Sequence, residues 1–319
     1  MSAMATARNG AAEPDVKPMT TRAWVAFAAM SVIWGVPYLF IKIAVDGGVP
    51  PLGLAWARVA LAAVVVLALA ARAGLLRTVK GRLGVIFAFA VIEIMIPFPL
   101  IAFGEQRLPS SLTAILIATV PLIVAVLSWL RGRSERPTAV QLAGLLMGFA
   151  GVVALVGIDV AHRPGELLGA LAVIGAATGY AIGAMIVKHG LADLDPRATM
   201  GVALAMAAVL LAPGALLTAP EHPPSAGAIA SIVVLGLVCT ALAFVVYSAL
   251  IIEAGAQRAV VITYINPVVA VALGVALLGE EPGVSALAGL VLILVGSWLS
   301  TDGRVPALRR RGQLAGGAR

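Results

Sequence analysis

Residues 110–152 read SSLTAILIATVPLIVAVLSWLRGRSERPTAVQLAGLLMGFAGV, and a degenerate copy of this stretch occurs later in the chain. A shift of 146 residues places Pro121 on Pro267 inside two apolar runs. A shift of 145 then aligns the segments that follow. Internal repeats fix the architecture before any local structure is assigned. The most informative identities under the second shift pair Glu135 with Glu280, Pro137 with Pro282, Gly144 with Gly289 and Gly151 with Gly296.

The repeat extends upstream of this stretch, so two copies account for most of the chain. Under the shift of 146, Trp34 aligns with Tyr180 and Lys42 aligns with Lys188. The first 22 residues are small and polar, and they lack the apolar core and cleavage site of a secretory signal. The predicted segments are a disordered cytoplasmic N-terminal tail (1–22), a first repeat (23–158), a second repeat (166–300) and a basic cytoplasmic C-terminal tail (301–319).

The composition excludes an ordinary soluble domain. Of the 319 residues, 61% are hydrophobic and 12% are charged, and the mean hydropathy is +1.05. A soluble domain carries roughly a quarter charged residues, so the outer surface of this chain must face lipid. The net charge of +7 is spread over short loops and a tail, which argues against a nucleic-acid partner. Cys239 is the single cysteine and the three histidines are scattered, so we expect no metal site, disulfide framework or cofactor.

Ten apolar runs are long enough to cross a bilayer, which requires about 20 mainly apolar residues. The expected fold is therefore an all-α integral membrane protein with ten transmembrane helices. Short connections rich in glycine and proline favour tight hairpins between neighbouring helices. The predicted crossings are 23–45, 52–73, 83–103, 110–130, 141–157, 167–187, 198–217, 228–252, 259–278 and 284–300.

The basic residues predict the orientation of these crossings. If the N-terminus is cytoplasmic, eighteen lysines and arginines fall in cytoplasmic segments and two, Arg107 and Arg163, fall on the other side. Cytoplasmic loops of membrane proteins carry an excess of Lys and Arg. The sequence therefore predicts that both termini are cytoplasmic, in a bacterial-type cytoplasmic (inner) membrane.

Each copy contains five crossings, and this odd number has a consequence for function. The second copy must enter the membrane from the opposite face, giving an inverted-topology repeat. That arrangement is typical of secondary transporters, which alternate between inward-open and outward-open states. A membrane-embedded enzyme and a channel are the alternatives. The chain has no phosphate-binding loop, which argues against transport driven by ATP. It has no Gly-x-Ser-x-Gly or His-Glu-x-x-His motif either, which argues against a hydrolase.

The segment 103–121, FGEQRLPSSLTAILIATVP, the repeated Glu-x-Pro turn and Arg58 near the start of the second helix carry a family resemblance. Together they resemble the paired EamA-type domains of the drug/metabolite transporter superfamily. The resemblance covers about residues 24 to 300. It implies ten helices around a central cavity built mainly by the first, third, fourth, sixth, eighth and ninth, and export of small metabolites or amino acids. These motifs do not select a substrate.

Three charged residues fall within predicted crossings: Lys42, Arg58 and Glu93. A charge at the bilayer centre costs about 2.5–3.5 kcal/mol and is usually retained for a pathway or a partner. Glu93 is expected either to couple protons or bind a substrate amine, or to form a buried ion pair with Arg58 or Lys42, and the two roles are compatible. Lys42 is expected to snorkel toward the interface. Arg58 is expected to hold helices together.

A second set of candidates supplies aromatic and hydrogen-bonding groups near the middle of the crossings. A cavity lined with such groups suits an amphipathic or amino-acid-like small molecule. Ordinary helix packing would also explain each residue taken singly, and at least two are expected to face the cavity. With Glu93, the predicted substrate-binding residues are Trp34, Tyr38, Tyr180, Tyr264 and Asn266.

Small residues and prolines complete the predictions. Gly175, Gly179 and Gly183 recur at four-residue spacing, a ridge that lets two helix backbones approach closely. Pro121 and Pro267 each remove a helix hydrogen bond, which predicts kinks or exposed carbonyls at equivalent points. The expected partners are a small-molecule substrate and the lipid bilayer, with a second copy of the chain as a candidate for a homodimer.

Overall fold

The computed structural model describes residues 19–131, 138–156, 163–254, 259 and 261–302, and the secondary structure of these residues is entirely helical. Most of both predicted tails, and the repeated Glu135 and Pro137, lie outside the described residues. The helices are α1 (Thr21–Ile33), α2 (Pro37–Asp46), α3 (Pro51–Arg72), η1 (Leu75–Arg77), η2 (Lys80–Arg82), α4 (Leu83–Phe89), η3 (Ala90–Met95), α5 (Pro97–Glu105), α6 (Ser110–Ile117), α7 (Val120–Leu130), α8 (Ala139–Ala154), α9 (Pro164–Ile186), η5 (Val187–Leu191), α10 (Pro196–Leu217), α11 (Ala226–Val233), η6 (Val234–Leu242), α12 (Ala243–Ala254), α14 (Ile262–Leu278) and α15 (Val284–Asp302).

Many of these helices join end to end into membrane-length spans, and the chain is a multi-pass membrane protein. Seven spans are long and apolar enough to cross a bilayer, and three apolar helices are shorter. Each of the ten predicted runs overlaps one of these spans or helices. The seven are Thr21–Asp46, Pro51–Arg72, Lys80–Glu105, Ser110–Leu130, Pro164–Leu191, Pro196–Leu217 and Ala226–Ile251; the three are Ala139–Ala154, Ile262–Leu278 and Val284–Ser300.

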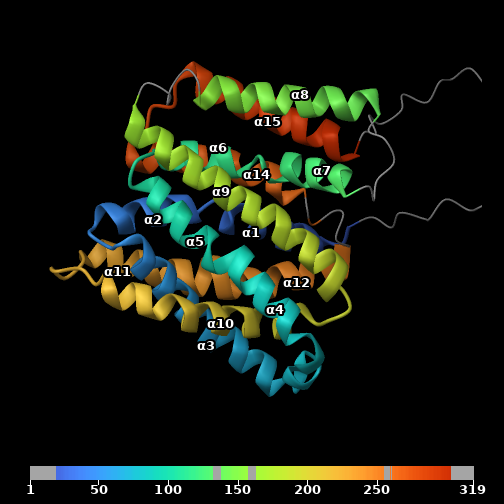
Figure 1. Cartoon of the computed structure of the whole chain (residues 1–319), viewed down its shortest axis with the longest axis vertical. Coiled ribbons are helices and arrows are strands. Elements are labelled where there is room, and N and C mark those ends of the chain that lie inside the picture. Colours follow the sequence, from blue (N-terminus) through green and yellow to red (C-terminus); the bar gives the residue numbers. More distant parts are fainter. Residues whose placement is uncertain (1–18, 132–137, 157–162, 255–258, 260, 303–319) are drawn as a thin grey trace, which may run out of the picture.

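The helices lie side by side between two closely packed pairs (Figure 1). The pair α8 and α15 forms one edge of the bundle, and the pair α3 and α10 lies toward the other. The contacts between the two halves of the chain come in matched sets. The packing of α5 on α9 has its counterpart in α12 on α1, and that of α7 on α9 has its counterpart in α14 on α1.

The α8–α15 pair owes its closeness to glycine. A Cβ atom built on Gly296 would lie 2.5 Å from both the Gly144 carbonyl oxygen and the Gly148 amide nitrogen. A Cβ atom on Gly144 would lie 2.8 Å from the Gly296 carbonyl oxygen. The two backbones are therefore in direct contact, as small residues permit between membrane helices.

The two matched prolines have different effects on their helices. Pro121 is the second residue of α7, and the chain leaves the α-helix at Ala118 and Thr119, so α6 and α7 are separate. Pro267 lies inside α14, which runs unbroken from Ile262 to Leu278. The helix is therefore interrupted just before Pro121 in the first half, whereas the equivalent helix of the second half continues through Pro267.

Wider π-helical turns also occur at equivalent places in the two halves. The turn η3 lies within the third long span, and η6 lies within the span Ala226–Ile251. The shift of 146 residues carries η3 into η6. Such turns are rare and are frequently found at functional sites.

Side-chain caps mark several helix starts on the rims of the bundle. Thr138 and Gln141 form a capping box at the start of α8, and the Ser225 hydroxyl accepts a hydrogen bond from the Ala228 amide at the start of α11. At the start of α10 the Asp195 carboxylate accepts from the Arg197 amide and side chain. The Arg197 guanidinium holds the pKa of the Asp195 carboxyl below its ordinary value.

The bundle has two ends, which we name by their residues. At the Glu105 end, α2 and α5 finish, α6 and α9 begin, and a Cβ atom on Gly104 would lie 3.2 Å from the Gly169 carbonyl oxygen. At the Lys188 end, α7, η5 and α15 finish (Figure 1). The span Pro164–Leu191 joins the two ends with 28 residues, which corresponds to about 42 Å at 1.5 Å per residue.

Candidate functional site

Arg58 is a buried basic residue that contacts side chains from two other helical segments of the interior. Its Nε donates a hydrogen bond to the Thr240 hydroxyl over 2.9 Å, and its Cζ lies 4.3 Å from the centre of the Phe98 ring. Thr240 in turn donates to the Leu235 carbonyl, five residues earlier, over 2.8 Å. The π-helical turn η6 therefore presents Thr240 to Arg58, and Arg58 links α3 to α5 and η6.

Two tyrosines from different halves of the chain lie near Arg58. Tyr38 on α2 interacts electrostatically with both Arg58 and Tyr180. Tyr180 on α9 interacts with Arg58 and with Glu93. Two of the six predicted substrate-binding residues, Tyr38 and Tyr180, thus lie near one guanidinium, and a third, Glu93, lies near Tyr180.

Glu93 does not form the ion pair that the sequence suggested. Its Oε2 is enclosed and has no hydrogen-bond partner. Arg58 is instead bonded to Thr240, and Lys42 is bonded to Asp46 over 2.9 Å. The reason is geometric: Glu93 projects from η3 against Gly183 on α9, where a Cβ atom would meet the carboxylate. Lys42 lies elsewhere, at the Glu105 end.

The glycine ridge on α9 makes this approach possible over part of its length. A Cβ atom on Gly179 would lie 2.7 Å from the Ile92 carbonyl oxygen, and one on Gly183 would meet Glu93. Gly175 faces more open space, with Leu100 Cδ1 the nearest atom at 3.5 Å. Two of the three predicted ridge positions are therefore close packing contacts.

Of the other three predicted residues, Trp34 caps the C-terminus of α1, and Tyr264 and Asn266 lie on α14. Trp34 packs against Tyr247, with ring centres 4.7 Å apart, and against Phe244 at 6.2 Å. With its side-chain amide turned to the orientation that its neighbours favour, Asn266 donates to the Ser31 carbonyl over 3.1 Å and to the Ile262 carbonyl over 2.9 Å. Tyr264 is half-buried on α14. Asn266 thus ties α14 to α1.

Glu105 is a buried acid that sequence reasoning missed. It is 0% exposed, and neither carboxylate oxygen has a hydrogen-bond partner. Lys42 Nζ donates to its backbone carbonyl over 3.1 Å. The one available signal was its place in the segment FGEQ, but a position at a helix end gave no reason to expect burial.

The neighbouring Glu280 has a defined structural role at the same end. Its Oε1 accepts the Ser110 amide over 2.6 Å, and its Oε2 accepts the Ser111 amide over 2.9 Å. A carboxylate is well placed at a helix N-terminus, where backbone amides lack intrahelical partners. The Glu-x-Pro turn before α15 thereby caps α6 and closes the Glu105 end.

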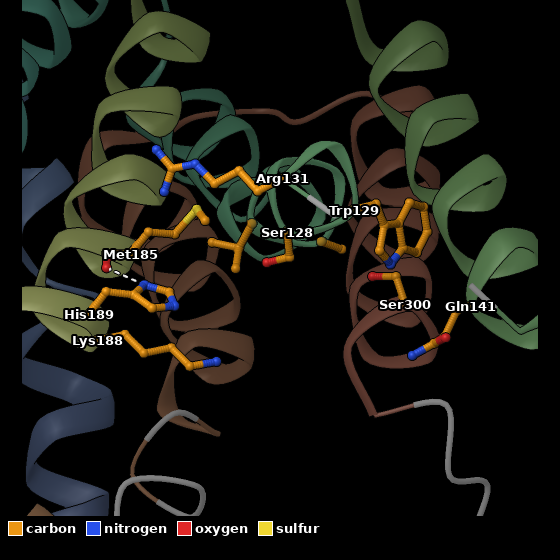
Figure 2. Close-up of a pocket in the computed structure, with 10 residues that line it drawn as sticks. Ser128, Trp129, Arg131, Gln141, Met185, Lys188, His189 and Ser300 are labelled. Atoms are coloured by element: carbon orange, nitrogen blue, oxygen red, sulfur yellow. Dashed lines mark hydrogen bonds between the residues drawn. The ribbon is translucent and has the colours of Figure 1, made fainter. Parts of the chain in front are cut away.

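A pocket of about 290 Å³ opens at the Lys188 end. Figure 2 shows Lys188 and His189 reaching into it from one side, with Trp129, Gln141 and Ser300 on the other. His189 Nδ1 lies 2.8 Å from the Met185 carbonyl oxygen. Among the residues that the structure describes, no acidic residue and none of the six predicted substrate-binding residues lines it. The lining residues are Val124, Ala125, Ser128, Trp129, Arg131, Gln141, Met185, Lys188, His189 and Ser300.

The two repeat-matched lysines occupy opposite ends of this arrangement. Lys42 lies with Asp46 at the closed Glu105 end, and Lys188 lines the open pocket. A second pocket, of about 320 Å³, lies beside Pro50, Leu100 and Phe103 and is mostly apolar. Among the described residues, no cluster of three or more His, Cys, Asp or Glu side chains could hold a metal ion.

Comparisons with known proteins bear on this arrangement. The model of a family described as "EamA-like transporter family" matches residues 21–157 and again 167–301. The chain is 30% identical over 261 residues to the "Uncharacterized inner membrane transporter YedA" of Escherichia coli (strain K12), covering 80% of this chain and 82% of the relative. It is 26% identical over 279 residues to the "Uncharacterized transporter YvbV" of Bacillus subtilis (strain 168), covering 86% and 90%.

A further relative and a solved structure extend the comparison. A "Probable amino-acid metabolite efflux pump" of Salmonella typhimurium is 26% identical over 282 residues, covering 85% of this chain and 92% of the relative. One solved crystal structure superposes with a TM-score of 0.61 at 21% identity, covering 88% of this chain and 96% of the other. At that identity the likeness concerns the fold alone.

Proposed function

The chain belongs to the EamA-like transporter family, and from this membership we propose that it is a secondary transporter that moves a small metabolite by alternating access. The observation that carries the proposal is the contrast between the two ends of the bundle. The Glu105 end is closed by Glu280 and the Lys42–Asp46 pair, and the pocket at that end is mostly apolar. The Lys188 end holds a pocket lined by basic side chains. A bundle open at one end and sealed at the other is one of the two states that alternating access requires.

The mechanism that we propose uses the repeat. Ten crossings in two inverted copies allow each half to adopt the arrangement of the other. Lys42 and Lys188 are counterparts under the repeat, and they now lie in a closed and an open environment respectively. In the alternative state the surroundings of the two lysines are exchanged. Substrate then reaches the interior near Arg58, Tyr38 and Tyr180 from either end in turn.

The proposed substrate is an amino-acid-like or amphipathic metabolite with a carboxylate, moved outward. Arg131, Lys188 and His189 give the pocket basic character, with Gln141 and Ser300 as further hydrogen-bonding groups. Charge-assisted hydrogen bonds to carboxylates are among the stronger polar interactions in proteins. A relative named as an amino-acid metabolite efflux pump supports the same substrate class and direction.

Counterflow in proteoliposomes tests the proposed function. Vesicles loaded with an unlabelled metabolite are expected to accumulate the labelled compound transiently, and the flux is expected to saturate. The screen begins with amino acids and related carboxylates. Linear, non-saturable flux would indicate a channel instead. Conversion of a compound without flux would indicate a membrane-embedded enzyme, and absence of both across a broad metabolite panel would contradict the proposal.

A labelling experiment tests the proposed orientation, with both termini in the cytoplasm. His222→Cys is expected to react with a membrane-impermeant maleimide added outside intact cells, and Arg77→Cys is expected to react only after the membrane is opened. His222 suits this test better than the neighbouring loop glycine Gly48, whose φ of +93° disfavours any side chain. The native Cys239 is 1% exposed and provides the unlabelled control. The opposite labelling pattern would reverse the orientation.

A further inference from the structure

Glu105 is the feature that the proposed function leaves unexplained. Its side chain is wholly buried at the end of α5, and both carboxylate oxygens lack hydrogen-bond partners. The hydroxyl of Ser110, also fully buried, lacks a partner as well. Glu105 does not line the pocket at the Lys188 end, and it forms no ion pair with another described residue. A buried polar group of this kind requires an explanation.

The charged and titratable groups that face Glu105 do not neutralise it. Lys42 is the nearest cation, but its Nζ is bonded to Asp46 and to the Glu105 backbone carbonyl. Both oxygens of Glu280 are used by the amides of α6. The packing from α9 is apolar at this point, with Val173 and the Gly169 backbone against Gly104. The groups that interact electrostatically with Glu105 are Tyr38, Lys42 and Asp46 from α2, Arg58 from α3, and Glu280 from the turn before α15.

An ionised carboxylate enclosed without a hydrogen-bonded partner costs far more free energy than the neutral acid, so such groups take up a proton when they are buried. The negative charges of Asp46 and Glu280 favour the neutral acid, and the positive charges of Lys42 and Arg58 oppose them. Neither cation donates a hydrogen bond to the carboxylate, whose two oxygens are enclosed without a partner. A bound metal ion is the other way to compensate the charge, but the described residues hold no group of acidic side chains suited to one. The surroundings of Glu105 therefore fit a proton.

We propose that Glu105 is a proton-binding site, and that closing the Glu105 end takes up one proton onto its carboxylate. When this end is open, water solvates the ionised Glu105. As it closes, a hydronium ion from that water transfers its proton to the carboxylate and leaves a water molecule behind. Falling pH then favours the sealed state seen here, and rising pH favours opening. The proposal rests on the alternating-access function, because it concerns the equilibrium between the two states.

The test follows the opening of this end directly and needs no transported substrate. Ser111→Cys places a thiol at a position 2% exposed in the sealed state, in a background where Cys239 is replaced by alanine. Its labelling rate by a maleimide is measured on purified protein across the acidic and neutral range. Each rate is divided by that of His222→Cys, an exposed position, to remove the intrinsic pH dependence of the thiol.

We expect the normalised rate to rise with pH, by at most about tenfold per pH unit for a single linked proton. Glu105→Gln, which mimics the protonated acid, is expected to give slow labelling without pH dependence. Glu93→Gln is expected to keep the pH dependence. A flat profile in the parent, an unchanged profile in Glu105→Gln, or loss of the profile only in Glu93→Gln would each overturn the proposal. None of these outcomes depends on whether a transported metabolite has been found.

A second measurement covers the case in which Glu105→Gln does not fold. Infrared spectra of the Glu93→Gln protein at acidic pH are expected to contain the carbonyl band of a buried, protonated carboxylic acid. The band is expected to disappear at the pH at which Ser111→Cys becomes reactive. Absence of the band in this variant would contradict the proposal, even if counterflow shows that the protein transports a metabolite.

Discussion

Replacing Gly296 by valine is expected to prevent the chain from folding stably, with the largest effect of any single substitution considered. The atoms that a Cβ would meet are the Gly144 carbonyl oxygen and the Gly148 amide nitrogen, both at 2.5 Å, and Gly148 Cα at 2.7 Å. All three belong to the backbone of α8 and have no rotamer through which to move aside. The α8–α15 pair would have to separate along its length, losing the contact that forms one edge of the bundle.

The expected cost of Gly296→Val lies at or above about 3 kcal/mol, the upper part of the usual range for overpacking. Thermal unfolding of the detergent-purified protein, read by size-exclusion elution, measures it. Gly175→Val is the matched control, since this helix glycine has Leu100 Cδ1 at 3.5 Å as its nearest neighbour and should lose little stability. Equal unfolding temperatures for the two variants would show that α8 and α15 are not in backbone contact.

Replacing Thr240 by valine is the second substitution with a large expected effect. The side chains are nearly equal in volume, but valine leaves the Arg58 Nε without its acceptor in a buried site. Hydrogen bonds to charged groups contribute about 1.5–3 kcal/mol, and we expect Thr240→Val to lower stability by that amount. Thr199→Val is the matched control, because the Thr199 hydroxyl is buried and has no partner. This second change should cost little or stabilise.

A double-mutant cycle identifies the cause of the loss. In an Arg58→Met background, Thr240→Val removes no bond to a charged group and is expected to cost much less than in the parent. Strict additivity of the two substitutions would show that the bond to Arg58 contributes nothing, and that Thr240 acts through packing or through its bond to the Leu235 carbonyl. Thermal unfolding in detergent again serves as the measurement.

The sequence predicted the helical elements well because their signals are local or repeated. The apolar runs, the Gly/Pro-rich connections and the repeat that pairs Pro121 with Pro267 suffice to locate the seven membrane-length spans and the three shorter apolar helices of the described residues. Hydropathy does not distinguish an α-helical turn from a π-helical one, so η3 and η6 could not be foreseen. The break before Pro121 and the continuity through Pro267 depend on packing that a repeat alone does not specify.

The interior was less predictable because its pairings join residues far apart in the chain. Arg58 and Thr240 are separated by 182 positions, and a threonine in an apolar run gives no sign that it accepts from an arginine. Glu93 was recognised as an intramembrane acid, but its facing residue, Gly183, could be identified only from the structure. Glu105 was overlooked because its burial depends on how the Glu280 turn and α2 cover the end of α5.

The π-helical turns η3 and η6 make the orientation of side chains depend on the number of residues in two spans, Lys80–Glu105 and Ala226–Ile251, as well as on their amino acids. A π-helical turn holds about one residue more than an α-helical turn, so η6 rotates everything that follows it by roughly one residue step, about 100°. That rotation sets the direction in which Phe244, on the following helix α12, meets Trp34, and the wide turn itself sets the direction in which Thr240 meets Arg58. Deleting a single residue within η6 would restore ordinary helical winding and turn these side chains away from their partners. Sequence variants that differ by one residue in this span therefore differ in the angular alignment of their interiors, even where every remaining amino acid is unchanged.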